Sequence, residues 1–275
     1  MDSDASAAAW AIVTEALALG GNLVVLTGAG ISAESGVPTF RGAEGYWTVG
    51  SRNYQPQELA TADAFCRMPR EIWRWYLYRR GVCRAAAPNA GHRALVEIEQ
   101  ALPGRFTLVT QNVDGLHLRA GSSREATLQI HGNIDFCRCA RECTADLFPM
   151  PDGFDRFGRD DALDDETFAR LACPRCGGPA RPHVLWFDEY YDEPRFRADS
   201  AIAAARDAAV LVVVGTAGAT NLPLQIGHAV ARAGRPIIDI NTDDNPFAEL
   251  ASRTDGRAVR GSAATLLPAL HAAIA

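Results

Sequence analysis

The fold of this chain is decided by the stretch LVVLTGAGISAESGVPTFR, which runs from Leu23 to Arg41. It opens with a continuous apolar run, Leu23–Leu26, which is typical of a parallel strand buried on both faces. Gly28 and Gly30 follow at the carboxyl end of that strand, where small residues let the backbone approach a ligand closely. Residues 31–34 indicate the first turn of a helix, whose free N–H groups suit a pyrophosphate. The stretch therefore predicts a nucleotide-binding turn between a strand and a helix.

An isolated Gly-x-Gly pair is weak evidence, and the third glycine of the usual dinucleotide fingerprint is missing here. The residues that follow make the turn more specific. The sequence Ser-Gly-Val-Pro at residues 35–38 ends the helix early. Phe40 and Arg41 then place an aromatic ring and a fixed cation just past the turn.

The rest of the chain alternates apolar strand patterns with helical patterns, which predicts an α/β fold with a doubly wound parallel sheet. Further strands are expected at residues 106–110, 128–130, 183–187, 209–214 and 236–240. Helices are expected at residues 7–19, 69–84, 90–101, 195–208, 222–233 and 263–274, with Asn89 as the N-cap of the third. In such sheets ligands bind at the carboxyl ends of the strands.

Composition excludes several classes of function. The 275 residues are 48% hydrophobic, enough for a full core, and the net charge of −6 without a basic run argues against a nucleic-acid partner. The sequence contains no apolar stretch of membrane-spanning length, and its acidic start does not resemble a signal peptide. We therefore expect a cytoplasmic protein with no membrane partner. All 27 basic residues are arginine.

The cysteines predict a metal site. Five of the seven cysteines lie between residues 137 and 176, and in a reducing compartment such clustering favours metal over disulfides. Cys173 and Cys176, followed by two glycines, form a typical zinc knuckle, and Cys139 with Cys143 has a permitted ligand spacing. Cys137 is near enough to replace either of this second pair. Four thiolates leave no open coordination position, so we expect this Zn2+ to be structural.

Polar side chains follow the predicted strands at the edge where a ligand should bind. Gln111, Asn112 and Asp114 follow the second strand, and His131 follows the third. Histidine titrates near neutrality, so His131 is a candidate general base. Asn241 and Asp243 follow the last predicted strand and suit ribose hydroxyls. The alternatives are a structural histidine for His131, a polar turn for the group after the second strand and a helix cap for the group after the last.

Several motifs resemble those of the sirtuin family and occur in the family's order. They are Gly28–Ser32, Gly36–Arg41, Thr110–His117, His131–Gly132, the cysteine pairs and Gly215–Thr216. The resemblance covers nearly the whole chain from Leu23 onward. It implies an NAD-dependent protein-lysine deacylase that consumes NAD and yields nicotinamide, free lysine and O-acyl-ADP-ribose. The implied partners are acylated lysine side chains of proteins or peptides.

The resemblance also implies an arrangement of domains and a set of site residues. A Rossmann-type domain would comprise residues 1–41, 89–131 and 183–275, and a small domain would have a helical part (42–88) and a zinc-binding part (132–182). Catalysis would fall to His131 and Asn112. NAD would contact Gly28, Ala29, Gly30, Ile31, Phe40, Arg41, Gln111, Asn112, Asp114, Gly215, Thr216, Ala217, Asn241, Asp243 and Ala263. The acylated substrate would contact Tyr76, Arg79, Val184, Trp186 and Phe187.

Tyr76 and Arg79 sharpen the expected substrate. They lie three residues apart in a helical segment, so they share a face. They look like the acyl-pocket pair of the desuccinylase-like branch, since an arginine fork and a phenol can hold a distal carboxylate. We expect activity on succinyl-, malonyl- or glutaryl-lysine beside acetyl-lysine.

Two departures from the family pattern bear on specificity. Asp188 stands where the family usually has glycine, and with Glu189, Asp192 and Glu193 it predicts an acidic lip that favours basic peptides. Ala217 replaces a serine, which removes one hydroxyl near the adenosine ribose. Protein mono-ADP-ribosyl transfer and an inactive NAD- or acyl-lysine-binding module are the alternative functions.

Overall fold

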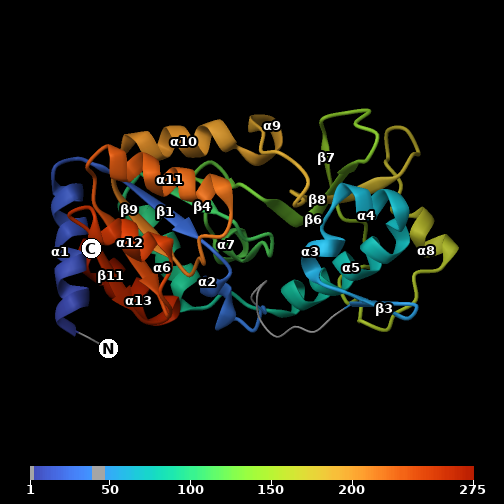
Figure 1. Cartoon of the computed structure of the whole chain (residues 1–275), viewed down its shortest axis with the longest axis horizontal. Helices are drawn as coiled ribbons and strands as arrows, with labels where there is room; N and C mark the ends of the chain where they lie inside the picture. The colour runs from blue at the N-terminus through green and yellow to red at the C-terminus, as the bar shows by residue number, and fades with distance from the viewer. Residues whose placement is uncertain (1–2, 39–46) are drawn as a thin grey trace.

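The computed structural model describes residues 3–38 and 47–275, and its larger part is built on a six-stranded sheet (Figure 1). The strand order is β11-β10-β9-β1-β4-β5, and every pairing is parallel. The strands are β1 (Asn22–Thr27), β4 (Phe106–Thr110), β5 (Thr127–Gln129), β9 (Ala208–Val214), β10 (Ile237–Asn241) and β11 (Arg257–Arg260). The expected α/β class is confirmed, although β11 was not expected because arginines flank its two apolar residues.

Helices cover both faces of this sheet, as continuous apolar strands require. In β1, Leu23 and Val25 face one core while Val24 and Leu26 face the other, following the two-residue period of a strand. The first core includes residues of α1 (Ser3–Ala18), α6 (Ala90–Ala101) and α13 (Ala263–Ile274). The second includes residues of α10 (Ala198–Asp207), α11 (Asn221–Arg232) and α12 (Pro246–Ser252).

Local signals explain where some of these helices begin. The Asn89 side chain accepts hydrogen bonds from the N–H groups of Gly91 and His92, which confirms it as the N-cap of α6. The single helix expected at 195–208 is instead two, α9 (Glu193–Phe196) and α10. They meet at Arg197, which has a left-handed φ of 53° and interrupts the helical path.

A short helix, α7 (Leu116–Ala120), joins β4 to β5, and a smaller lobe on the right of Figure 1 carries most of the remaining elements. Its helices are α3 (Pro56–Leu59), α4 (Ala62–Arg67), α5 (Pro69–Ala85) and α8 (Asp165–Ala169), and β2 (Trp47–Val49) pairs with β3 (Arg52–Tyr54). An antiparallel sheet has the order β7-β6-β8, formed by β7 (Leu147–Pro149), β6 (Gly132–Cys139) and β8 (Ala180–Val184). Trp73, Leu77, Phe154 and Trp186 belong to the lobe's own core.

The strand expected at 183–187 is therefore misplaced. The chain is extended at 180–184 and pairs antiparallel with β6, outside the parallel sheet. The apolar run Val184–Phe187 suggested a buried strand, but only its first residue belongs to β8 and the other three lie beyond the end of the strand. Within the described residues, the helices are too short or too polar to cross a bilayer.

The sheet has a topological switch point next to β1. The chain proceeds from β1 to β4 and β5 on one side, and β9, β10 and β11 extend the sheet on the other. The turns after β1 and β9 thus leave the sheet side by side, where α/β proteins bind ligands. The first turn leads into α2 (Gly30–Ala33), which confirms the short helix expected after the glycines.

Candidate functional site

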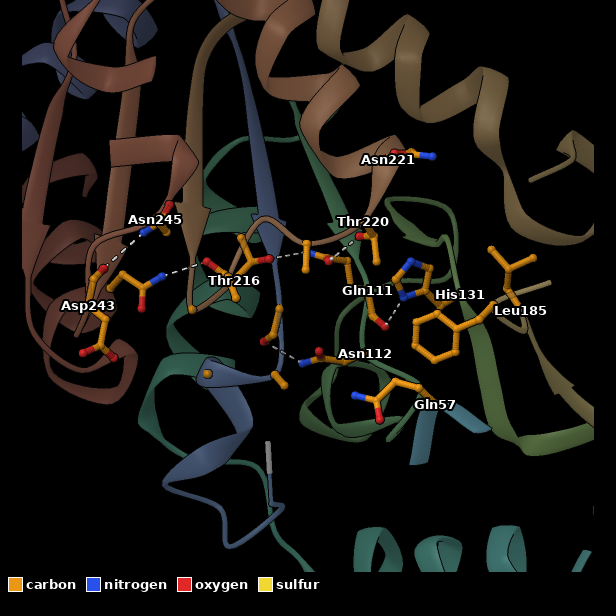
Figure 2. A pocket seen from close by; sticks show the side chains of 18 of the residues that line it. Gln57, Gln111, Asn112, His131, Leu185, Thr216, Thr220, Asn221, Asp243 and Asn245 are labelled. Atoms are coloured by element: carbon orange, nitrogen blue, oxygen red, sulfur yellow. Dashed lines mark hydrogen bonds between the residues drawn. The ribbon is translucent and has the colours of Figure 1, made fainter. Parts of the chain in front are cut away.

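A cleft of about 640 Å3 opens at the carboxyl edge of the sheet, beside the switch point (Figure 2). Its walls come from the turns after β1, β4, β9 and β10, together with the segment that follows β8. The volume lies within the range of small-molecule and cofactor sites. The residues that line the cleft include Gly28, Gly30, Gln111, Asn112, His131, Tyr191, Thr216, Thr220 and Asn241.

The floor of the cleft depends on a close crossing of two turns. The N–H of Gly30 donates to the carbonyl oxygen of Gly215 over 2.8 Å. A Cβ on Gly30 would lie 2.6 Å from the Gly215 Cα, and Gly215 itself has a φ of 60°. The two glycines are therefore needed for contact between turns as well as for approach to a ligand.

Asn112 is fixed so that one polar atom of its amide remains for a ligand. Its Nδ2 donates to the carbonyl oxygen of Gly28 over 3.0 Å and to the Ser32 Oγ over 3.3 Å. These two bonds use both amide hydrogens, so the Oδ1 oxygen is left as an acceptor on a residue that lines the cleft. An acceptor in this place suits a sugar hydroxyl.

A buried network supports Asn112 from below. Ser32 donates to the Asp114 Oδ2 over 2.7 Å, and the other carboxylate oxygen accepts from the Leu116 N–H over 2.8 Å. Burial raises the pKa of Asp114, against the effect of these hydrogen bonds. His92 contacts the Ser32 Oγ at 3.4 Å, and burial lowers its pKa to about 4. The network thus places a neutral imidazole and a carboxylate behind the cleft wall.

His131 also lines the cleft, directly before the first strand of the lobe. Its Nδ1 lies 3.0 Å from the Gln111 carbonyl oxygen, a bond drawn in Figure 2, and its Nε2 lies 2.8 Å from the Tyr191 hydroxyl. A carbonyl oxygen only accepts, so Nδ1 carries the proton and Nε2 has the lone pair. Burial lowers the pKa of His131 to about 4, against the effect of the Gln111 carbonyl, so the ring is neutral and can accept a proton.

The far end of the cleft is a loop held by a buried carboxylate. Asn241 donates to the Thr216 carbonyl oxygen over 2.9 Å, which joins the turns after β9 and β10. Asn245 caps α12 and donates to the Asp239 Oδ2 over 2.8 Å. Burial raises the pKa of Asp239 to about 6. The loop therefore presents amide groups and the exposed Asp243 to the cleft on a fixed backbone.

The four expected cysteines come together in the lobe. The sulfur atoms of Cys139, Cys143, Cys173 and Cys176 all lie within 4.8 Å of one another, and two of the pairs are 3.7 Å apart. Sulfurs bonded to one tetrahedral Zn2+ at about 2.3 Å are about 3.8 Å apart, so the group fits zinc. Cys137 lies in the apolar core of the lobe instead, which settles the open alternative. None of these four cysteines is in the cleft lining, consistent with a structural ion.

Comparisons with known proteins agree with this geometry. A model of the Sir2 family matches residues 28–221, more than half of the chain. The chain belongs to the Sir2 family. An NAD-dependent protein deacylase of Aquifex aeolicus is 40% identical over 234 residues, covering 84% of this chain and 87% of that protein.

Solved structures of Sir2 homologues share the fold at moderate sequence identity. A Sir2 homolog–NAD complex has a TM-score of 0.75 and 34% identity, over 92% of this chain and 89% of that chain. A mutant Sir2 homologue bound to 2'-O-acetyl ADP ribose has a TM-score of 0.75 and 35% identity, over 92% and 91% of the two chains. As a member of the Sir2 family, this protein uses NAD, and its cysteine cluster fits the structural zinc.

The resemblance to the Sir2 family implied NAD contacts for several residues that do not line the cleft. Phe40 and Arg41 lie outside the described residues. Ala263 is in the first apolar core at the start of α13, so it does not line the cleft. Ile31 is also a core residue, and Asp114 supports the floor from behind. The other expected members line the cleft: Gly28, Ala29, Gly30, Gln111, Asn112, Gly215, Thr216, Ala217, Asn241 and Asp243.

The expected acyl-side residues also divide into two groups. Trp186 and Phe187 line the cleft, whereas Val184 is a core residue of the lobe and Leu185 takes its place in the wall. Tyr76 lies behind Trp186, whose Nε1 donates to the Tyr76 hydroxyl over 2.8 Å. Tyr76 is thus one contact away from the cleft.

The carboxylates of the acidic lip expected after Trp186 have partners within the protein. Glu189 pairs with Arg181 and Arg138, and Glu193 pairs with Arg197. The Asp188 carboxylate accepts from the N–H groups of residues 62 and 63 at the start of α4. Sequence alone could not show the partners of Asp188 and Glu189, since they lie in α4, β6 and β8, so the surface charge is smaller than the composition suggests.

Several lining residues were missed. Thr220 and Asn221 begin α11, and Thr242 and Asn245 follow β10. The rule that ligands bind at carboxyl ends of strands would have found these four. Gln57 and Tyr191 come from segments outside the parallel sheet, and no local pattern marks them.

Proposed function

We propose that this protein is an NAD-dependent protein-lysine deacylase. The observation that carries the proposal is the neutral imidazole of His131 in the wall of the nucleotide cleft, with the basic nitrogen identified as Nε2. The named activity of relatives with about 40% identity supports the same reaction.

The residues of the cleft fit the two tasks of this reaction. NAD, when bound, supplies the ribose carbon that takes the acyl oxygen as nicotinamide leaves. His131 then accepts the proton of a ribose hydroxyl, which attacks the acyl carbon, and Asn112 offers its Oδ1 to a ribose hydroxyl. The glycine turns and the loop after β10 hold the remainder of the nucleotide, and the apolar wall of Leu185, Trp186 and Phe187 restricts water.

We further propose that acidic acyl groups are among the substrates. The Tyr76 hydroxyl accepts from Trp186, so its own proton is available to donate. Burial raises the pKa of Tyr76, which keeps that proton in place at physiological pH. Arg79 lies one helical turn further on, with its guanidinium 5.4 Å from the Trp75 ring, and brings a fixed cation to the same face of α5. A phenol and a guanidinium together suit a distal carboxylate.

The protein's place in the cell is part of the same proposal. All seven cysteines are free, which is compatible with a reducing, cytoplasmic location. The substrates would be acylated lysines of proteins or peptides.

Turnover of acetyl- and succinyl-lysine peptides with NAD tests the proposal, with products identified by mass spectrometry. Free O-acyl-ADP-ribose is the expected product. An ADP-ribosylated protein would instead indicate a transferase, and an absence of nicotinamide release would indicate a binding module. His131→Ala should abolish acyl transfer while NAD still binds.

The acyl preference is tested with Arg79→Met. Loss of a charged hydrogen-bond partner costs about 1.5–3 kcal/mol, so the succinyl-to-acetyl ratio of kcat/KM should fall by roughly ten- to a hundredfold. Arg74→Met is the matched control, because Arg74 lies on the same helix but pairs with Glu71. Equal ratios for Arg79→Met and wild type would exclude the proposed role.

A further inference from the structure

Tyr191 occupies the basic nitrogen of His131. The phenol oxygen lies 2.8 Å from Nε2, and the two rings are 5.8 Å apart between centroids. Since Nδ1 donates to the Gln111 carbonyl, Nε2 can only accept, and the phenol is the donor. The lone pair that the deacylase reaction requires is therefore engaged by an O–H group of the protein.

The backbone on both sides of Tyr191 holds it in this place. Before it, Glu189 accepts from the Trp186 N–H over 2.9 Å and pairs with Arg181. After it, Asp192 caps α9 by accepting from the Arg195 N–H over 2.8 Å. The segment is thus anchored independently of His131, so the contact follows from the fold.

The donor character of Tyr191 is secure at physiological pH. Burial raises the pKa of Tyr191 to about 12, so the phenol keeps its proton. Thr220 donates to the Gln111 Oε1 over 3.2 Å, and the Gln111 carbonyl oxygen accepts from His131 Nδ1, so the base and the residue that fixes its tautomer are joined to Thr220 in one group. Figure 2 shows Thr220, Gln111 and His131 on the same wall of the cleft.

We propose that the Tyr191 hydroxyl caps the general base of the unliganded protein: it donates to the Nε2 lone pair of His131 and is displaced by a ribose hydroxyl of NAD. The inference rests on the proposed function, in which His131 deprotonates that hydroxyl. An imidazole nitrogen has a single lone pair, so a phenol and a ribose hydroxyl cannot both donate to it in line. NAD binding and the Tyr191 contact are thus in competition.

This competition predicts that NAD affinity rises when the hydroxyl is removed, a change that loss of a merely structural residue would not produce. Tyr191→Phe keeps the ring and its packing but removes the donor that NAD must displace. A net hydrogen bond of ordinary strength corresponds to about fivefold in affinity, so NAD should bind about fivefold more tightly to this variant. KM for NAD should fall while kcat changes little, because the ribose hydroxyl has replaced the phenol by the time of proton transfer.

Removal of the Tyr191 hydroxyl should also change the pKa of His131. A donor to Nε2 favours the neutral ring, so its removal should raise the pKa of His131. The acidic limb of the kcat/KM profile for NAD should move to higher pH. Nitrogen-15 NMR of the histidine side chains, assigned with His131→Asn, should show Nδ1 protonated in the unliganded wild type.

The experiment compares Tyr191→Phe with wild type and with Tyr190→Phe, by calorimetric titration of NAD, thermal unfolding and NMR. Tyr190 is the matched control, since it is the neighbouring tyrosine and 92% exposed. Unchanged or weaker NAD binding by Tyr191→Phe, or protonation of Nε2 instead of Nδ1, would overturn the inference. These readouts need no acylated peptide, so failure of acyl transfer would refute the proposed function without deciding the role of Tyr191.

Discussion

The crossing of the turns after β1 and β9 makes Gly30 the sharpest test of how this cleft is built. Gly30 is at the start of α2, so an alanine there would be acceptable to the helix itself. The added Cβ would lie 2.6 Å from the Gly215 Cα and 2.8 Å from its carbonyl oxygen. Comfortable contact between carbon atoms begins at about 3.5 Å, so the two turns must separate by about 1 Å.

The expected cost follows from that displacement. Overpacking of a tight contact costs about 1–3 kcal/mol, and the 2.8 Å bond from Gly30 to Gly215 contributes about 1 kcal/mol more. Gly30→Ala should therefore lose about 2–4 kcal/mol of unfolding free energy, a fall in Tm of about 4–7 °C for a chain of 275 residues. Both turns line the cleft, so NAD affinity should fall at least about tenfold, equivalent to about 1.4 kcal/mol.

Gly20→Ala is the control that measures the effect of backbone strain without a change in the geometry of the cleft. Gly20 has a φ of 80° and nothing within 4 Å of an added Cβ, and it is in the turn before β1, at the opposite end of that strand from the cleft. Its substitution should cost about 1 kcal/mol of stability through backbone strain alone. NAD titration and thermal unfolding of both variants provide the assay. If Gly30→Ala matched wild type in Tm and in NAD affinity, the reasoning from the crossing would be refuted.

Two further perturbations address the zinc and the buried carboxylate. Cys176→Ser should abolish zinc binding, measured per chain by atomic absorption, and lower the Tm, since a structural zinc contributes directly to folding. Cys66→Ser, at an exposed cysteine outside the cluster, should change neither the zinc content nor the Tm. Equal zinc content in the two variants would contradict the assignment. Asp239 has a pKa of about 6 in the fold against about 3.9 when unfolded, so its protonated form stabilises the protein below about pH 4 and this contribution, about 3 kcal/mol, is lost as pH rises through 6. Asp239→Asn should remove that decline from a series of urea unfolding curves between pH 4 and 7, whereas an unchanged slope would show that Asp239 is already ionised.

The parallel sheet was predictable because its signals are local. The apolar run before Gly215 is rich in valine, which favours a strand, and Asn89 caps the helix that follows it through its neighbouring N–H groups. The elements that escaped prediction are short or mostly polar. In β11 only two apolar residues lie between Arg257 and Arg260, so the strand exists because β10 offers an edge to pair with.

The site divides in the same way between local signals and long-range contacts. Polar residues after strands identified Gln111, Asn112 and His131 as neighbours of the cleft, because parallel strands bring their carboxyl ends together. Ala263 was assigned to NAD by resemblance, yet it begins a helix whose apolar face packs on the sheet. The contact of Tyr191 with His131 joins residues 60 positions apart through a segment without regular structure, so no pattern in the sequence indicates it.

The chemical character of His131 illustrates why those long-range contacts decide function. An isolated histidine has two interchangeable nitrogens, and either can carry the proton. Here the Gln111 carbonyl fixes the proton on Nδ1, and the Gln111 side chain is itself held by Thr216 and Thr220, which follow β9. The direction of the lone pair therefore depends on how the turn after β4 lies against the turn after β9. In the sheet, β1 separates these two strands. His131 is a base with a defined lone-pair direction only because the switch point of the sheet brings those two turns together.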